Sequence, residues 1–238
     1  MALYIVSTPI GNLEDMTYRA VKVLNEVDLI LAEDTRVSGH LLTHYGISKP
    51  MSPYHDFNKE KVTPALVERL KQGARIALIS DAGTPGIADP AFNLVRAAIK
   101  ENIKVIPVPG ASAILTALVG SGLPTDRFIF EYFLPHKSAQ RKRLFETLKN
   151  EPRTIIFYET PHRIFKVLNE MDEIFGEVLV VIGRELTKMY EEFLRGSPKT
   201  LISHFEKKPP RGEMVVMFNI RVAAFEKREP NEKTDTPI

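Results

Sequence analysis

The chain has 238 residues, enough for one large domain or two small ones, and it is 44% hydrophobic and 26% charged, as globular proteins usually are. Its 32 basic and 30 acidic residues leave a net charge of +2, which excludes a histone-like coat of positive charge and an acidic disordered chain. The absence of cysteine excludes disulfides, thiolate metal sites, iron–sulfur clusters and cysteine nucleophiles. No segment resembles a secretion signal or a membrane span, so we expect a cytoplasmic protein.

Short apolar runs alternate with amphipathic segments through the first half of the chain. The apolar runs predict buried strands, and the segments with an apolar stripe predict helices. The expected strands are residues 3–6, 28–32, 75–80 and 104–107, and the expected helices are residues 17–26, 64–71 and 90–100. This alternation favours an α/β fold with a largely parallel sheet.

The segment Pro107-Val-Pro109-Gly110 interrupts this pattern near the middle of the chain, where a two-domain protein has its hinge. We therefore expect an N-terminal α/β domain at residues 1–109, a C-terminal α/β domain at 110–222, and a polar, disordered tail at 223–238. Less regular alternation in the second domain favours a mixed sheet. Its expected helices are residues 111–119, 138–149, 162–172 and 198–205, and its expected strands are residues 127–131, 154–158, 178–182 and 213–220.

Three loops are candidates for ligand binding because each lies at the carboxyl end of an expected strand, where parallel sheets bind ligands. The loop at residues 80–90 holds two glycines, two prolines, two aspartates, a serine and a threonine, which is excessive for a simple connection. The loops at residues 7–13 and 109–113 are rich in small residues and offer free amides. On local sequence an ordinary strand–helix turn is the favoured interpretation of the first of these two loops. Tight helix packing explains the second equally well, and a helix N-cap explains Asp89 equally well.

Charged residues follow another expected strand, in the segment Ala32-Glu33-Asp34-Thr35-Arg36. Two carboxylates and a guanidinium at this sheet edge are suited to orienting a substrate or taking a proton. The alternative is a solvated helix N-terminus, where the helix dipole favours acidic residues.

The stretch at residues 135–153 carries six basic and two acidic side chains, a net charge of +4 that exceeds the charge of the whole chain. It predicts a surface for RNA phosphates, although a basic solvated helix face is the competing interpretation. The basic candidates for RNA binding are Lys137, Arg141, Lys142 and Arg143.

The sequence has no Walker A loop, no Gly-x-Gly-x-x-Gly fingerprint and no His-Glu-x-x-His motif. His40 and His44 have the spacing of a shared metal site on a helix, but surface residues on a short helix are the favoured interpretation, so we predict no metal.

Taken in order, these motifs resemble one family. They are the segments at residues 4–13, 32–36, 80–90 and 107–112, followed by 157–163, 183–188, 195–196 and 211–213. Over residues 3–221 the chain resembles the ribosomal RNA small subunit methyltransferase I family, within the tetrapyrrole methylase superfamily.

The resemblance implies a two-domain fold that binds S-adenosylmethionine (AdoMet) in a cleft between the domains, and usually a homodimer. It implies methyl transfer to the ribose 2′-hydroxyl of a cytidine in the decoding region of 16S rRNA, in naked RNA or in an assembled particle. The AdoMet contacts that it implies are Pro9, Ser80, Asp81, Ala82, Gly83, Ile87, Ser112 and Ala113, and, from the more variable second half, Tyr158, Leu186 and Gly212.

A ribose hydroxyl is a weak nucleophile, so we expect a base or an oriented hydrogen bond to assist it. The catalytic candidates are Glu33, Asp34 and Arg36, where Arg36 grips a phosphate or stabilises a carboxylate, with Asn12 and Glu159 as secondary candidates. Two alternatives stay open: the same fold acting on a tetrapyrrole or another small molecule, and a non-catalytic RNA- or nucleotide-binding module. The aromatic residues at 54–57 and 130–133 fit either RNA stacking or core packing.

Overall fold

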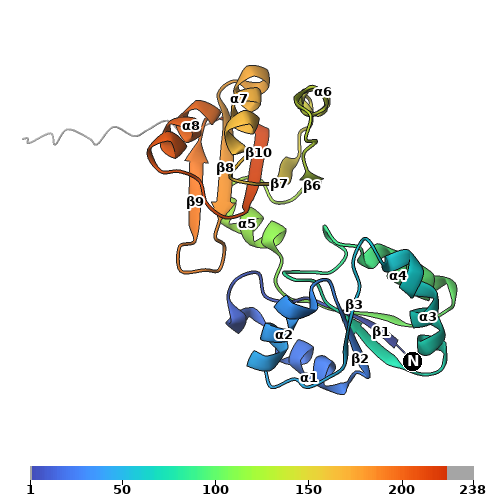
Figure 1. Cartoon of the computed structure of the whole chain (residues 1–238). Coiled ribbons are helices and arrows are strands. Elements are labelled where there is room, and N and C mark those ends of the chain that lie inside the picture. The colour runs from blue at the N-terminus through green and yellow to red at the C-terminus, as the bar shows by residue number, and fades with distance from the viewer. Residues whose placement is uncertain (1, 224–238) are drawn as a thin grey trace, which may run out of the picture. The chain divides into compact units, whose positions relative to one another are not determined.

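The protein is described by a computed structural model that covers residues 2–223. These residues form two compact units, and each unit has its own five-stranded sheet (Figure 1). Unit 1 holds residues 2–116 and 186–190, and unit 2 holds residues 117–185 and 191–223. The domain boundary expected near Pro109 stays a prediction. Of the expected tail, Ala223 ends the last strand and the rest lies outside the described residues.

Unit 1 is the α/β domain that the first half of the sequence predicts. Its five strands are all parallel, in the order β3-β2-β4-β1-β5. Its elements are β1 (Ala2–Val6), η1 (Leu13–Asp15), α1 (Tyr18–Glu26), β2 (Leu29–Ala32), α2 (Thr35–His44), β3 (Met51–Pro53), α3 (Lys59–Lys71), β4 (Arg75–Leu78), α4 (Ala91–Lys100) and β5 (Val105–Val108).

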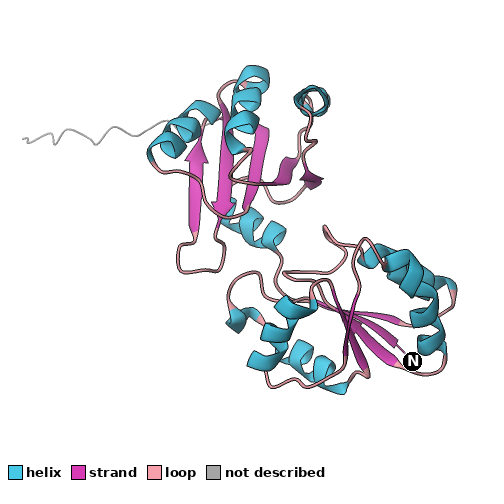
Figure 2. Cartoon of the chain, viewed as in Figure 1, coloured by secondary structure: helices cyan, strands magenta, loops and turns pink. Residues whose placement is uncertain are grey.

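Alternating side chains of these strands enter two separate cores, one on each face of the sheet. Figure 2 shows helices on both faces of this sheet. On β2, Leu29 and Leu31 pack with α3 and α4, whereas Ile30 and Ala32 pack with α1 and α2. Because both faces are covered, β1, β2 and β4 are apolar along most of their length, as the sequence indicated.

Two elements of unit 1, η1 and β3, were missed in the sequence, α2 was anticipated only as a short helix around His40 and His44, and α3 was placed too short. The helix α2 contains Gly39 and few strong helix formers, but the Asp34 side chain caps its first turn. The strand β3 ends in Pro53, which an edge strand tolerates. The expected start of α3 at Pro64 was wrong, because the helix already begins at Lys59.

Unit 2 contains a mixed sheet, in agreement with the expectation. The strand order is β6-β7-β10-β8-β9, in which only β6 and β7 run parallel. Its elements are β6 (Phe128–Phe133), α6 (Ser138–Leu148), β7 (Thr154–Glu159), α7 (Ile164–Phe175), β8 (Val178–Arg184), β9 (Glu192–Gly196), α8 (Pro198–Lys207) and β10 (Met214–Ala223), and α5 (Ala113–Ser121) runs from unit 1 into it.

Helices α6, α7 and α8 share one continuous hydrophobic core with this sheet. The core includes Phe145 from α6, Val167 from α7 and Phe205 from α8, each at most 1% exposed. The edge strand β9 lies between residues 182 and 198, where the sequence predicted no helix or strand. Its side chains are mostly half-buried, so it lacks the apolar run that marks β8.

Candidate functional site

Three loops at the carboxyl edge of the unit 1 sheet are tied together by hydrogen bonds. Thr8 and Gly83 exchange backbone hydrogen bonds of 2.9 and 3.1 Å, and the Thr8 hydroxyl donates to the Ser80 carbonyl. The Ser7 and Thr84 hydroxyls lie 3.0 Å apart, and the Thr84 hydroxyl donates to the Ala111 carbonyl. The loops that follow β1, β4 and β5, which we call the joined loops, therefore form one assembly, although they are far apart in the sequence.

The backbone of the 80–90 loop is held in an uncommon conformation. Gly83 has φ +84°, a region that favours glycine, and an added Cβ would lie 3.3 Å from Ile10 Cγ2. Asp89 Oδ1 accepts hydrogen bonds from the amides of Gly86 and Ala91, so this residue also organises the start of α4. Asp89 Oδ2 is buried without a partner among the described residues. The loop is thus a fixed structure that contains one buried carboxylate oxygen without a partner among the described residues.

Asp81 joins the loop after β4 to the segment after β2. The Asp34 amide donates a 3.1 Å hydrogen bond to Asp81 Oδ1. The two segments were both expected at this sheet edge, and their strands are neighbours in the sheet.

Glu33 lies in a small pocket between these segments. The pocket is lined by Glu33, Tyr54, Leu78, Ile79, Ser80, Asp89, Pro90 and Ala91. Burial raises the pKa of Glu33, and the nearby carboxylates of Asp81, Asp89 and Asp56 raise it further. A carboxylate whose pKa is raised in this way is a stronger base than an exposed glutamate.

Asp34 and Arg36 pair with each other rather than facing this pocket as free groups. Arg36 donates to both carboxylate oxygens of Asp34, through Nε at 3.1 Å and Nη2 at 2.6 Å. These hydrogen bonds, with the helix-capping bond from the Arg36 amide, hold the pKa of Asp34 well below its usual range. Asp34 is therefore a helix cap and a weak base, and Glu33 is the better candidate for proton transfer.

The other predicted cofactor residues of unit 1 lie on or beside the joined loops. Pro9 is buried in the loop after β1, Ile87 is 45% exposed in the loop after β4, and Ser112 and Ala113 are half-buried at the start of α5. Leu186 is buried in the 186–190 segment, which is grouped with unit 1. A Cβ on Gly11 would lie only 2.6 Å from Lys188 Cγ, so this segment packs closely against the loop after β1.

The remaining predicted cofactor residues lie in unit 2. The ring of Tyr158 on β7 packs against the rings of Phe130 and Phe133, with distances between ring centroids of 5.0 and 5.3 Å. Burial raises the pKa of Tyr158 to about 12, with a smaller effect of Glu213. Gly212 is exposed in the turn before β10.

The predicted basic surface needs one correction. Arg141 is only 2% exposed, and its guanidinium binds both oxygens of Glu170 at 2.5 and 2.7 Å and the Pro135 carbonyl. Burial raises the pKa of Glu170, but hydrogen bonds from Arg141 and Ser138 outweigh this effect and lower it overall. Arg141 is therefore a structural residue and cannot contact RNA.

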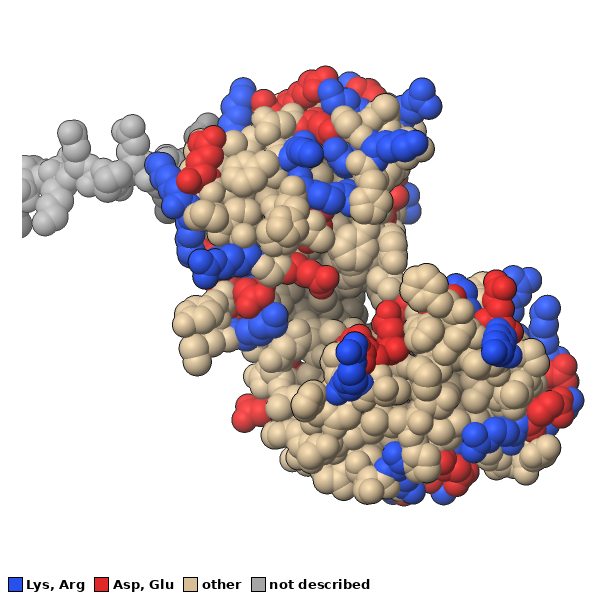
Figure 3. Space-filling model, in the orientation of Figure 1, with Lys and Arg blue, Asp and Glu red and all other residues tan. Residues whose placement is uncertain are grey.

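The other basic candidates of this stretch are accessible. Lys137 and Arg143 are exposed, and half-buried Lys142 pairs with Glu173 at 2.5 Å. Figure 3 shows Lys and Arg side chains gathered on the part of unit 2 where Figure 1 places α6.

The secondary candidates have structural partners. Asn12 Oδ1 accepts a hydrogen bond from the Glu14 amide and caps η1. Glu159 is fully buried, accepts from the Thr160 amide and lies 3.2 Å from Arg163 Nε.

Comparison with known proteins decides the family. A family model for tetrapyrrole (corrin/porphyrin) methylases matches residues 2–202. Ribosomal RNA small subunit methyltransferase I of Haemophilus influenzae is 52% identical over 218 residues, which cover 90% of this chain and 77% of that protein. The protein of the same name from Thermotoga maritima is 49% identical over 217 residues, which cover 91% of this chain and 97% of that protein. The chain belongs to the ribosomal RNA small subunit methyltransferase I family.

Solved structures show the tetrapyrrole methylase fold independently. Diphthine synthase has a TM-score of 0.72 at 15% identity, covering 92% of this chain and 90% of that one. CobJ, a methyltransferase, has a TM-score of 0.67 at 16% identity, covering 91% of this chain and 93% of that one. The resemblance and the fold class expected from the sequence are confirmed, and family and fold support a methyltransferase with an AdoMet-type donor.

The sequence motifs of this tetrapyrrole methylase did not reveal every residue that builds the site. Thr8 and Thr84, which join the loops, were not singled out, although both lie inside segments that were. Asp56 was seen only as part of an aromatic segment, and its effect on Glu33 depends on the position of β3 beside β2.

Neither a metal site nor a membrane span is found in this tetrapyrrole methylase across residues 2–223. No group of three or more His, Asp or Glu side chains there is arranged to hold a metal ion, and His40 and His44 both lie on α2. No helix in the same range is long and apolar enough to cross a membrane.

Proposed function

We propose that the chain is an AdoMet-dependent methyltransferase that methylates the ribose 2′-hydroxyl of a cytidine in the decoding region of small-subunit ribosomal RNA. The names of relatives about 50% identical to this chain support the acceptor. The observation in the structure that carries the proposal is Glu33, a half-buried carboxyl with a raised pKa beside the joined loops.

The residues of unit 1 suit AdoMet. When bound, AdoMet supplies a methyl group on a positively charged sulfur. Asp81, whose Oδ1 accepts from the Asp34 amide, carries a second carboxylate oxygen that can accept from ammonium or ribose hydroxyl groups. Small residues along the joined loops, including Ala82, Gly83, Ser112 and Ala113, allow a ligand to approach the backbone closely.

Methyl transfer needs little covalent chemistry from the protein. With AdoMet bound, Glu33 would take the proton of the ribose 2′-hydroxyl while that oxygen displaced the methyl group from sulfur, and the carbon–sulfur bonding pair would stay on sulfur. The largest contribution of the protein is to hold the oxygen about 3–3.5 Å from the carbon, which lowers the activation free energy by up to about 7–11 kcal/mol. A general base increases the rate of such a step by a further factor of about 10² to 10⁴. Arg36, held by Asp34 at an exposed position, is available to an RNA phosphate.

Labelling with tritiated AdoMet tests the proposal. Undermethylated small ribosomal subunits, free ribosomal RNA and a tetrapyrrole are offered in parallel, and labelled RNA is digested to nucleosides. We expect label in the ribose of a cytidine. Label in the tetrapyrrole would support the same fold with a different acceptor, and no label anywhere would support a non-catalytic RNA-binding module.

Two variants test the role of Glu33. We expect Glu33→Gln to lower turnover at saturating substrate by about 10²-fold or more. Asp34→Asn serves as the matched control, because it changes the adjacent carboxylate, whose proposed role is capping. Near-normal turnover of both variants would overturn the assignment of a base in this segment.

The homodimer and the cytoplasmic location are also proposals. Light scattering of the purified chain tests the first, and fractionation of cells tests the second.

A further inference from the structure

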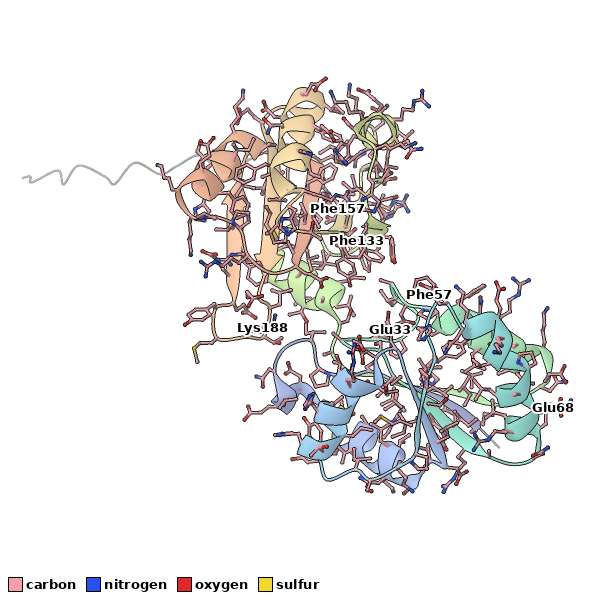
Figure 4. The ribbon with its side chains drawn as sticks, viewed as in Figure 1. Glu33, Phe57, Glu68, Phe133, Phe157 and Lys188 are labelled. Carbon is pink, nitrogen blue, oxygen red and sulfur yellow. The ribbon has the colours of Figure 1, made fainter. Side chains whose placement is uncertain are left out.

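Phe57 is an aromatic side chain with almost no packing against the protein. It is 98% exposed, between the edge strand β3 and the helix α3 (Figure 4). The neighbouring Tyr54, by contrast, is 1% exposed and belongs to the core. An isolated exposed Phe needs no functional explanation by itself. Its surroundings give it one.

The loop that carries Phe57 is fixed by hydrogen bonds. The Tyr54 amide donates to the Ala32 carbonyl at 2.8 Å. The Asn58 side chain accepts from the His55 amide at 2.9 Å and donates to the Pro53 carbonyl at 3.0 Å. The loop is thus closed on itself, so its backbone loses little conformational freedom when a ligand contacts the exposed ring.

The loop lies at the same sheet edge as the proposed base. Ala32, the residue before Glu33, is paired with Pro53 in the parallel register of β2 and β3. Asp56, next to Phe57, is close enough for its charge to act on Glu33. A molecule that reaches Glu33 at this edge is therefore within reach of Phe57.

The charges around this edge indicate which part of RNA Phe57 receives. Glu33, Asp81 and Asp89 are acidic and act on one another there, as does Asp56, which is also paired with Lys59 at 2.7 Å. His55 acts on Glu33 in the opposite direction, and the exposed Arg36 is paired with Asp34, so the groups nearest Glu33 are mainly negative. Negative side chains repel phosphates, whereas an uncharged base is not repelled. Unpaired bases are recognised by stacking on aromatic rings.

We propose that Phe57 is a stacking platform for an unpaired base of the RNA acceptor, placed beside Glu33 by the loop at residues 54–58. The inference rests on the proposed function and adds a specificity-determining residue to that site. Phe57 makes the acceptor site selective for splayed, single-stranded RNA.

Kinetics with a set of variants tests the platform. We expect Phe57→Ala to raise KM for undermethylated small subunits roughly 5- to 150-fold, as expected for the loss of one stacked base. We expect Phe57→Tyr and Phe57→Trp to keep KM within a few-fold of the wild-type value, because both retain an aromatic face. We expect Phe57→Leu, which lacks that face, to raise KM beyond this range. AdoMet affinity, measured by calorimetry, stays unchanged in all of them. Tyr18→Ala is the matched control, because Tyr18 is also 98% exposed but begins α1 on the other face of the sheet.

A Phe57→Ala variant with KM within two-fold of wild type would overturn the platform. So would equal losses for Phe57→Leu and Phe57→Tyr, because the role would then not depend on an aromatic face. A matching loss of AdoMet affinity would assign Phe57 to the cofactor site instead.

Fluorescence separates this inference from the proposed function. The chain contains no tryptophan, so Phe57→Trp introduces a single reporter. We expect protein-free small-subunit ribosomal RNA to quench its emission and AdoMet alone to leave it unchanged. Quenching without methylation of any RNA would support the platform and overturn the proposed activity. Methylation without quenching would keep the activity and overturn the platform.

Discussion

Arg141 and Glu170 form a two-point ion pair inside unit 2, with side chains only 3% and 9% exposed. The remaining Arg141 nitrogen, Nη1, donates to the Pro135 carbonyl, and the Ser138 hydroxyl donates to Glu170 Oε1. The pair therefore connects the start of α6 to α7. It fixes the helix that carries the exposed basic residues Lys137 and Arg143.

Breaking this pair should destabilise the fold strongly. We expect Arg141→Met to lower the free energy of unfolding by about 3–5 kcal/mol, because it leaves a buried carboxylate without its partner. The measurement is chemical denaturation at pH 7. Lys142→Met is the control: it removes a solvent-accessible pair of the half-buried Lys142 with Glu173 and should cost at most about 1 kcal/mol. Equal effects of the two variants would contradict a buried, structural role for Arg141.

Acid should weaken the same pair. The folded pKa of Glu170 is lowered from its ordinary value of 4.5, so its contribution to stability is fully present above that pH. It is lost as the pH falls through the folded pKa. We expect wild type to lose stability more steeply than Glu170→Gln below pH 4.5, in melting curves recorded from pH 6 to pH 3. Parallel curves would refute the linkage.

Glu33 should show the opposite dependence on pH. Its folded pKa is raised above 4.5, so the folded protein binds more protons than the unfolded chain between the two values. Stability therefore falls as the pH rises through that window and stays lower above it. Glu33→Gln removes this loss, and we expect it to melt at or above the temperature of wild type at pH 7 while its turnover falls. A variant that is less stable than wild type by the same amount at every pH would disprove this account.

Gly83→Ala tests the joined loops. An alanine at φ +84° costs about 1–2 kcal/mol of backbone strain, and it would displace the segment that Thr8 holds. We expect both lower stability and weaker AdoMet binding by calorimetry. Gly73→Ala provides the control, because it has φ +103° and lies between α3 and β4, outside the joined loops. It should lose stability while AdoMet binding is unchanged. Equal AdoMet affinities of the two variants would count against the proposed cofactor site.

The exposed basic residues should set the salt dependence of RNA binding. Combining Lys137→Gln with Arg143→Gln removes two charges, and we expect the slope of log K against log salt to fall by about 1.4 for single-stranded RNA. AdoMet binding should not change. Lys207→Gln, an exposed charge at the end of α8, is the control in the same unit. The hypothesis fails if the control changes the slope as much as the double variant.

Much of the fold follows from local patterns. The apolar runs of β1, β2, β4 and β8 are buried on both faces or along their length, so their sequences alone reveal them. The strands β3 and β9, which sequence patterns missed, form because neighbouring strands pair with them, and Asp34 caps the first turn of α2. The start of α3 contains the good helix formers Lys59, Glu60 and Lys61, and Pro64, where the helix was expected to begin, lies inside it.

By itself, the sequence determined the α/β class, the loops at the strand ends and the family, because each depends on residues close together in the chain. The tertiary structure decided which charges and rings are available. Arg141 and Lys142 are adjacent, yet the first is buried because Glu170 faces it from 29 positions away, and Tyr54 enters the core while Phe57 does not. The pKa of Glu33 likewise depends on Asp56, Asp81 and Asp89, which only the parallel order of β3, β2 and β4 brings near it. Burial and charge interactions depend on distance in space, and that distance is set by how the strands are ordered in the sheet.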